Sequence, residues 1–281
     1  MNNPLKLNPL ARLIHRREAR FWEQGSPDEM WQQVLSGEAP ELRRGRWILR
    51  HVPADPRCKL CNAPFRGIGA PLMQLLGKGP SQLNPSLCKT CLDISPSGGA
   101  ELELTRLFAD VRGSTTLAEK MSPMEFSRLI DRYYSAATRL IIQDNGFVSR
   151  LIGDQMIALY LPAFSGSDHA GIAIKTASEL LRTTGHEQTG GPWIPVGVGI
   201  HTGQAFVGKV GHEGVTDFTV LGDAANVTAR LTSQARAGEI LISEDAAAAA
   251  NLPPGEFEIR NLELKGRSSA LQVWVLRITA S

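Results

Sequence analysis

The sequence predicts an α+β protein, with a ferredoxin-like βαββαβ core and added strands and helices, preceded by a small metal-binding module and an N-terminal helical region. Three observations lead to this prediction. From Glu101 onward, strand-like runs alternate with runs of helical periodicity. Before that region, four cysteines come as two C-x-x-C pairs. A turn-rich segment at 95–100, SPSGGA, lies between the two and is predicted to be a linker.

The first 50 residues are predicted to be helical and polar. Within them, the run SPDEMWQQVLSG has the signals of a capped helix, with Ser26 as the N-cap, Pro27 as the first helical residue and Gly37 as the stop. Several arginines give the region a local basic excess, which we interpret as a solvated or partner-binding face. The formal net charge of the whole chain is only +2, so composition does not favour a nucleic-acid partner.

Membrane and export signals are not found in the sequence. No run approaches the roughly 18 uninterrupted apolar residues that a spanning helix needs. The N-terminal segment has neither a long apolar region nor a small-residue cleavage site. We therefore expect no membrane span and a cytoplasmic location.

The segment 51–94 contains all four cysteines and is rich in glycine and proline. The spacing C-x₂-C-x₂₆-C-x₂-C indicates a metal site, because each pair directs two thiolates at one ion. We expect a structural zinc ion bound by Cys58, Cys61, Cys88 and Cys91. An iron–sulfur cluster is the alternative and would make the module a redox sensor. Buried thiols without a metal are a third interpretation, and the regulatory partner of the module is unknown.

The region 101–281 is predicted to be one catalytic domain. Its elements follow in the order of a ferredoxin-like core with additions. We expect a strand at 101–111, a helix at 123–146, two strands around a tight Gly-Asp turn at 147–162, a helix at 168–185, a pair of strands at 193–211, a helix at 222–235, a short strand at 240–243, and closing strands at 257–266 and 271–278.

Two aspartates stand at strand ends. Asp110 closes the first predicted strand, and Asp154 lies in the turn Gly153-Asp154. If the sheet places these strands side by side, the two carboxylates converge, as two-metal phosphoryl chemistry requires. Gly113 and Ser114 open a helix whose N-terminus suits a phosphate. By themselves, the two aspartates are also explained as a helix N-cap and an ordinary turn residue.

Several segments together resemble one family. FADVRGST, LIGDQ, GIHTGQAFVGKVG, TDFTVLGDAANVTARL and LELKGR occur in the order and at about the distances seen in class III adenylate and guanylate cyclases. The resemblance covers roughly residues 101–278. It implies a domain that makes a 3′,5′-cyclic nucleotide and pyrophosphate from a nucleoside triphosphate.

The resemblance also implies the roles of individual residues. Asp110, Asp154 and the carbonyl of Val111 match the ligands of two Mg²⁺ or Mn²⁺ ions. Asn226 matches the residue that orients the ribose, and Arg230 matches the one that stabilises phosphate charge in the transition state.

Lys265 in LELKGR matches a lysine that contacts the terminal phosphates. The family divides these residues between two subunits, and this chain carries both halves. We therefore expect a homodimer with two equivalent sites.

The base-reading positions depart from the family pattern. Arg150 stands where adenylate cyclases have lysine, and Thr219 where they usually have aspartate. A guanidinium can donate to adenine N1, and a hydroxyl can accept from the exocyclic amine, so ATP is the expected substrate. GTP is the alternative, since arginine can also donate to guanine O6 and N7.

Two other classes of protein are weighed against an active cyclase. One is a weakly active, cyclase-like module that binds nucleotide and signals through its cysteines. The other is a zinc-ribbon protein that binds nucleic acid on a cyclase-derived scaffold, which the near-neutral charge does not favour.

Overall fold

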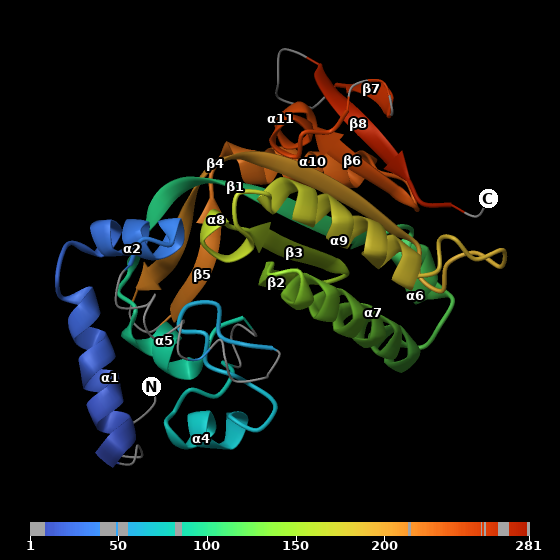
Figure 1. Ribbon diagram of the computed structural model, residues 1–281. Helices are drawn as coiled ribbons and strands as arrows, with labels where there is room; N and C mark the ends of the chain where they lie inside the picture. The colour runs from blue at the N-terminus through green and yellow to red at the C-terminus, as the bar shows by residue number, and fades with distance from the viewer. Residues whose placement is uncertain are drawn as a thin grey trace. The chain divides into compact units, whose positions relative to one another are not determined.

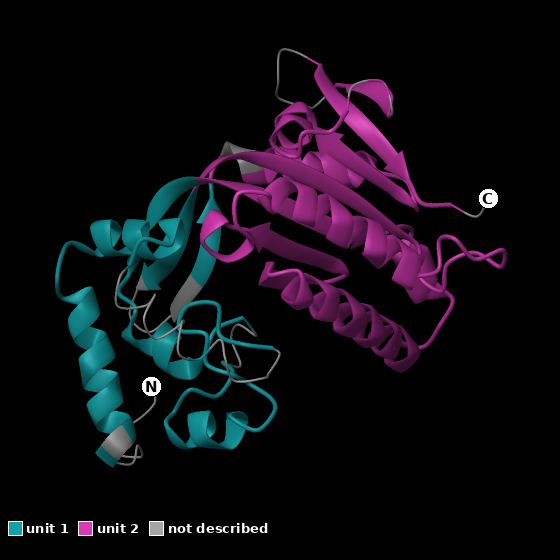
Figure 2. Ribbon diagram, viewed as in Figure 1, with its two compact units in different colours: residues 1–102, 206–221 teal, residues 103–205, 222–281 magenta. Residues whose placement is uncertain are grey.

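The computed structural model of the protein describes residues 9–39, 49, 56–81, 86–212, 215–253, 255, 257–263 and 270–279. The chain forms two compact units, coloured separately in Figure 2. They comprise residues 1–102 with 206–221, and residues 103–205 with 222–281. Two long strands, β1 (Gly98–Val111) and β4 (Val196–His212), each contribute residues to both units.

The first unit combines short helices with a hairpin that comes from late in the sequence. Its further elements are α1 (Pro9–Trp22), α2 (Pro27–Ser36), α4 (Ala70–Leu75), α5 (Lys89–Ile94) and β5 (Val215–Leu221). The predicted capped helix is confirmed as α2. The Ser26 hydroxyl accepts a hydrogen bond from the Glu29 amide at 3.4 Å, and Gly37 ends the helix with φ of 83°.

The second unit contains most of the regular structure (Figure 1). Its further elements are α6 (Ser114–Glu119), α7 (Pro123–Gln143), β2 (Phe147–Ile152), β3 (Gln155–Tyr160), α8 (Pro162–Ser165), α9 (His169–Thr183), α10 (Asp223–Gln234), β6 (Glu239–Ser243), α11 (Glu244–Ala249), β7 (Glu258–Leu262) and β8 (Leu271–Arg277).

The strands pair in the order β2-β3-β1-β4-β6-β8-β7, with β5 paired to β4. The first four strands of the core thus stand in the order second, third, first, fourth, which is the arrangement of a ferredoxin-like fold. Strand β3 is antiparallel to both β1 and β2, whereas β4 and β6 are parallel. The predicted fold class is confirmed.

Both faces of the sheet are buried in the second unit. Strand β6 shows this by alternation, because Ile240 and Ile242 pack in the cluster formed with α7 and α9, whereas Leu241 packs with α10. The larger cluster includes Leu107 of β1 and Tyr133 of α7. These helices hold the C-terminal part of β1 and the β2–β3 pair in place.

One part of the strand prediction is wrong. Residues 193–211 are predicted to form a pair of strands, but they contain one continuous strand, β4. The strand that forms a hairpin with β4 is β5, which has no counterpart among the predicted strands. The glycines in this run suggest a turn, but Gly208 serves another purpose. A Cβ atom there would lie 2.2 Å from the carbonyl oxygen of Gly98, so glycine permits the backbones to approach closely.

The remaining differences concern element ends. Strand β1 begins at Gly98, inside the predicted linker. Strand β7 covers part of the predicted strand 257–266, of which residues 264–266 lie outside the described residues. The division of the chain at 1–50, 51–94, 95–100 and 101–281 stays a prediction. In the part of the chain that the structure describes, none of the helices has the length and apolar character needed to cross a membrane.

Candidate active site

The two aspartates singled out in the sequence lie together. Asp110 is the residue of β1 that pairs with Gln155 at the start of β3, and Asp154 directly precedes Gln155. The pairing of β1 with β3 thus brings the two carboxyl groups close together. Burial raises the pKa of Asp110, the Arg112 charge opposes this, and the neighbouring Asp154 charge adds to it. The predicted convergence of two carboxylates is present in the fold.

A hydrogen bond from helix α7 stabilises the turn that carries Asp154. Gly153 has φ of 63°, a left-handed conformation that allows β2 and β3 to be joined by two residues. The Tyr134 hydroxyl on α7 donates a hydrogen bond to the Gly153 carbonyl at 2.8 Å. This tyrosine is absent from the sequence-based site. A tyrosine that follows another in a long amphipathic helix gives no signal of such a contact.

Arg112 forms an ion pair with the Asp110 carboxylate. Its Nε also donates to the Asp110 carbonyl at 3.4 Å, and its Nη1 donates to the Ser233 carbonyl of α10 at 3.3 Å. The guanidinium therefore neutralises one carboxylate and connects the acidic pair to α10. Arg112 is absent from the sequence-based site, although a nearby cation is expected beside two adjacent carboxylates.

The acidic pair fits a hard divalent cation. Mg²⁺ and Mn²⁺ prefer carboxylate and carbonyl oxygens, and the backbone of Val111 follows Asp110 directly. The carboxylates are partly exposed rather than enclosed, with Asp110 25% exposed at its side chain. Such a site leaves coordination positions open to a substrate.

The predicted phosphate loop lies next to this pair. Gly113 has φ of 67° and precedes α6, whose first residue is Ser114. A Cβ atom at Gly113 would meet nothing within 4 Å, so the residue has open space around it. The positive φ, rather than crowding, is the reason for glycine at this position.

Helix α10 carries the predicted ribose and transition-state residues. Asn226 is exposed and Arg230, one turn later, is partly buried. Within the residues that the structure describes, no carboxylate forms an ion pair with Arg230. The helix is anchored by Val227 and Leu231, which pack against Leu241 of β6, while the hydroxyl of the buried Thr232 donates to the Thr228 carbonyl at 2.7 Å.

The base-reading candidates lie in different units. Arg150 is an exposed residue of β2, at an irregularity in the pairing with β3. Thr219 is a partly buried residue of β5 and pairs with Gly208 of β4. Lys265 lies outside the described residues.

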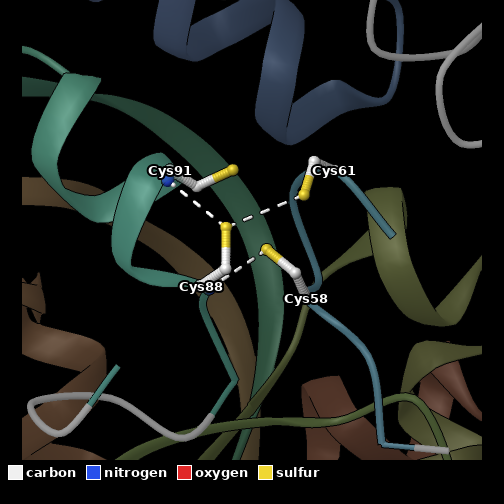
Figure 3. A group of neighbouring side chains, drawn as sticks. All are labelled: Cys58, Cys61, Cys88 and Cys91. Atoms are coloured by element: carbon white, nitrogen blue, oxygen red, sulfur yellow. Dashed lines mark hydrogen bonds between the residues drawn. The ribbon is translucent and has the colours of Figure 1, made fainter. Parts of the chain in front are cut away.

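The four cysteines converge in the first unit, as predicted. Their Sγ atoms all lie within 4.8 Å of one another, and all four residues are buried (Figure 3). The Sγ atoms of Cys61 and Cys88 are 3.8 Å apart. This arrangement can hold a metal ion.

The catalytic region matches a known family. The family described as "Adenylate and Guanylate cyclase catalytic domain" matches residues 101–277, which include both aspartates and α10. The chain belongs to this cyclase family. The four-cysteine module precedes the matched residues.

Relatives of this cyclase differ in the nucleotide that their names specify. An adenylate cyclase of Anabaena cylindrica is 31% identical over 202 residues, which are 66% of this chain and 40% of the relative. Guanylate cyclase 2G of Mus musculus is 28% identical over 179 residues, which are 61% of this chain and 16% of the relative. The chain thus spans less than half the length of either relative.

Among solved structures, the guanylyl cyclase Cya2 is 27% identical to this chain, with a TM-score of 0.56 over 64% of this chain and 93% of that one. The chain therefore shares its fold with a protein named as a guanylyl cyclase. Family membership leaves open which purine this cyclase domain takes.

Proposed function

We propose that the protein is an adenylate cyclase that converts ATP to 3′,5′-cyclic AMP and pyrophosphate as a homodimer. The observation that carries this proposal is the strand pairing that brings the Asp110 and Asp154 carboxyl groups close together beside the open loop at Gly113. Membership of a cyclase family supports the same chemistry.

Asp110, Asp154 and the Val111 carbonyl would bind two divalent cations. When bound, these ions would make the ribose 3′-hydroxyl more acidic and neutralise charge on the phosphates. In the reaction, the 3′ oxygen bonds to the α-phosphorus as the bond to the bridging oxygen of the β-phosphate breaks. Pyrophosphate leaves, and the hydroxyl proton passes to solvent.

Two side chains of α10 would orient the substrate. Asn226 would bind the ribose, and Arg230 would stabilise the negative charge that builds up on the phosphates. Residues four apart lie on one face of a helix, so both can reach the same nucleotide. Gly113 and Ser114 would approach the phosphates from the loop, and Lys265 would contact the terminal ones.

The position of Arg230 on α10 supports the proposal of a homodimer. Arg230 has no carboxylate partner among the described residues, although a half-buried guanidinium gains from one. A second copy of the chain would bring its own nucleotide to this arginine. Each of the two sites would then take metal ligands from one subunit and α10 from the other.

The choice of ATP rests on Arg150 and Thr219. A guanidinium only donates hydrogen bonds, so it suits N1 of adenine, and the threonine hydroxyl can accept from the adenine amine. The relatives include both adenylate and guanylate cyclases, so GTP is the competing substrate.

One observation favours a second candidate, a weakly active cyclase-like module. Arg112 already neutralises Asp110, and an ion pair at this place competes with a metal ion. Such a module would bind nucleotide and turn it over slowly.

The test is a product assay on the purified chain with Mg²⁺ or Mn²⁺ and each of the four nucleoside triphosphates, read by mass spectrometry. We expect cyclic AMP, and we expect Asp110→Ala and Asp154→Ala to abolish it. Asp131→Ala, which removes an exposed carboxylate of α7, is the matched control. Absence of any cyclic product from a dimeric preparation would overturn the proposal, and cyclic GMP alone would overturn the choice of substrate.

A further inference from the structure

The four-cysteine module contacts the β4–β5 hairpin within the first unit. We propose that the four cysteines bind a single zinc ion, and that this ion fixes the hairpin carrying Thr219 by holding α5 against it. The effect on catalysis rests on the proposed cyclase function, whereas zinc binding and the order of the hairpin do not.

The spacing of the sulfur atoms fits one ion. Four thiolates at about 2.3 Å from a tetrahedral zinc ion are separated by about 3.8 Å along each edge. The Sγ atoms of Cys61 and Cys88 are 3.8 Å apart, and the whole group lies within 4.8 Å. In an iron–sulfur cluster the four cysteines are divided among two or four iron atoms, so as a group they spread farther apart than one tetrahedron allows.

The backbone around the cysteines is arranged for thiolates. The amide of Cys88 donates to the Cys58 Sγ at 3.3 Å, and the amide of Cys91 donates to the Cys88 Sγ at 3.4 Å. After the first pair, Asn62 adopts φ of 63°, and its amide donates to the Cys58 carbonyl at 2.8 Å. Asparagine tolerates this left-handed conformation and closes a tight turn around the first pair of ligands.

A buried lysine stands beside the sulfur atoms. Lys78 is 5% exposed, and its Nζ lies 2.6 and 2.7 Å from the two carboxylate oxygens of Glu18 on α1. Its ammonium group is close enough to interact electrostatically with Cys61, Cys88 and Cys91. Four thiolates and one zinc ion carry a net negative charge, which a buried ammonium group offsets.

The helix that supplies two of the ligands is hydrogen-bonded to β4. Cys88 is the N-cap of α5 and Cys91 lies in its first turn. At the other end of the helix, Lys209 of β4 donates to the carbonyls of Leu92 and Ser95 at 2.8 and 2.9 Å. A displacement of α5 on loss of the ion would therefore break two charged hydrogen bonds to the hairpin.

Strand β5, the partner of β4 in the hairpin, is also held by contacts within the first unit. Lys209 pairs with Phe218 of β5, which is the neighbour of Thr219. The ring of Phe218 lies 5.6 Å from the fully buried Trp31 ring of α2, and the Trp31 indole donates to the Pro96 carbonyl at 3.1 Å. Pro96 follows Ser95, the C-cap residue of α5. The ion, α5 and the strand that carries Thr219 thus form one connected structure.

The first test measures metal and structure on the full chain. Elemental analysis should find one zinc ion per chain, and replacement by Co²⁺ should give the absorption of a tetrahedral thiolate site. Hydrogen–deuterium exchange before and after zinc chelation should become faster in residues 206–221 and stay unchanged in α7 and α9. Iron in place of zinc, an iron–sulfur absorption band, or unchanged exchange in the hairpin would each overturn the proposal, whether or not the protein is a cyclase.

A variant tests the link without disturbing the ligands. Lys209→Met should retain zinc, speed exchange in the hairpin, and raise KM for the nucleotide roughly tenfold, since two hydrogen bonds to a charged group are lost. Lys120→Met, at an exposed position after α6, is the control. If hydrogen–deuterium exchange in the hairpin is the same in Lys209→Met as in the control, the proposed connection through α5 is wrong. The zinc content measured above tests the metal site independently of this connection.

Discussion

The two candidate metal sites of this protein are built in opposite ways. In the first unit, four thiols are buried within 4.8 Å of one another, and a buried lysine stands beside them. In the second unit, two carboxylates meet at the end of β1, partly exposed, with an arginine paired to one of them. The first arrangement closes all four positions around an ion, whereas the second leaves room for a substrate.

This difference follows from what each site must do. A structural ion needs ligands that exclude water and competing groups, and four thiolates from two short loops provide them. A catalytic ion must also bind phosphate and a reacting hydroxyl, so the protein supplies only part of the coordination. The repulsion between Asp110 and Asp154 stays in the folded protein until a cation arrives, and Arg112 relieves it in part.

The largest expected effect is on turnover, if α10 of one subunit and the acidic pair of the other form each active site. Arg230→Ala should lower turnover on the order of 10³-fold, because the transition state loses its cation. An equal mixture of Arg230→Ala with Asp110→Ala should regain about a quarter of the native rate, since half of the dimers are mixed and each has one intact site. Assay of each variant alone and of the mixture measures this, and no recovery in the mixture would contradict division of the site between subunits.

The next effect tests the closed site. Lys78→Met should weaken zinc binding about 10–100-fold, because it removes the positive charge beside the sulfur atoms. Competition with a chromophoric chelator measures the affinity. Lys89→Met, an exposed lysine in the same module, should bind zinc like the native chain. Equal affinity in both variants would show that Lys78 only pairs with Glu18.

A smaller effect is expected at Thr219 of β5, the proposed base-reading residue in the unit of the closed site. Thr219→Val should raise KM for ATP by up to roughly tenfold, since one hydrogen bond to the base is lost. Thr219→Ser keeps the hydroxyl and should behave like the native chain. Steady-state kinetics with ATP and GTP distinguish a base contact from a general loss of activity, because only the former changes the ratio between the two nucleotides.

The smallest effect tests the open site. Arg112→Met should lower the Mn²⁺ concentration for half-maximal activity roughly fivefold, as expected when a partly exposed ion pair no longer competes for Asp110. Titration of activity with Mn²⁺ measures the shift, and Arg128→Met on α7 serves as the control. A higher Mn²⁺ requirement would instead assign Arg112 to the phosphates.

Much of the fold is predictable from local patterns. The Gly-Asp turn between two strands predicts the β2–β3 pair, and Ser26, Pro27 and Gly37 mark the ends of α2, because these signals act over a few residues. The strand pair predicted at 193–211 fails for the opposite reason. Gly208 is required there by a contact with Gly98, which lies some hundred residues away in the sequence and therefore leaves no local signal.

The sequence by itself determined the fold class, most of the helices and strands, the cysteine spacing and the residues that resemble a cyclase site. Only the tertiary structure decided that Asp110 and Asp154 lie close together, that Arg112 connects Asp110 to α10, and that Lys78 with Glu18 lies near the four cysteines. It also placed residues 206–221 in the unit of the cysteine module. These contacts join segments that are distant along the chain, and their energies depend on burial and charge that arise only when the chain is folded.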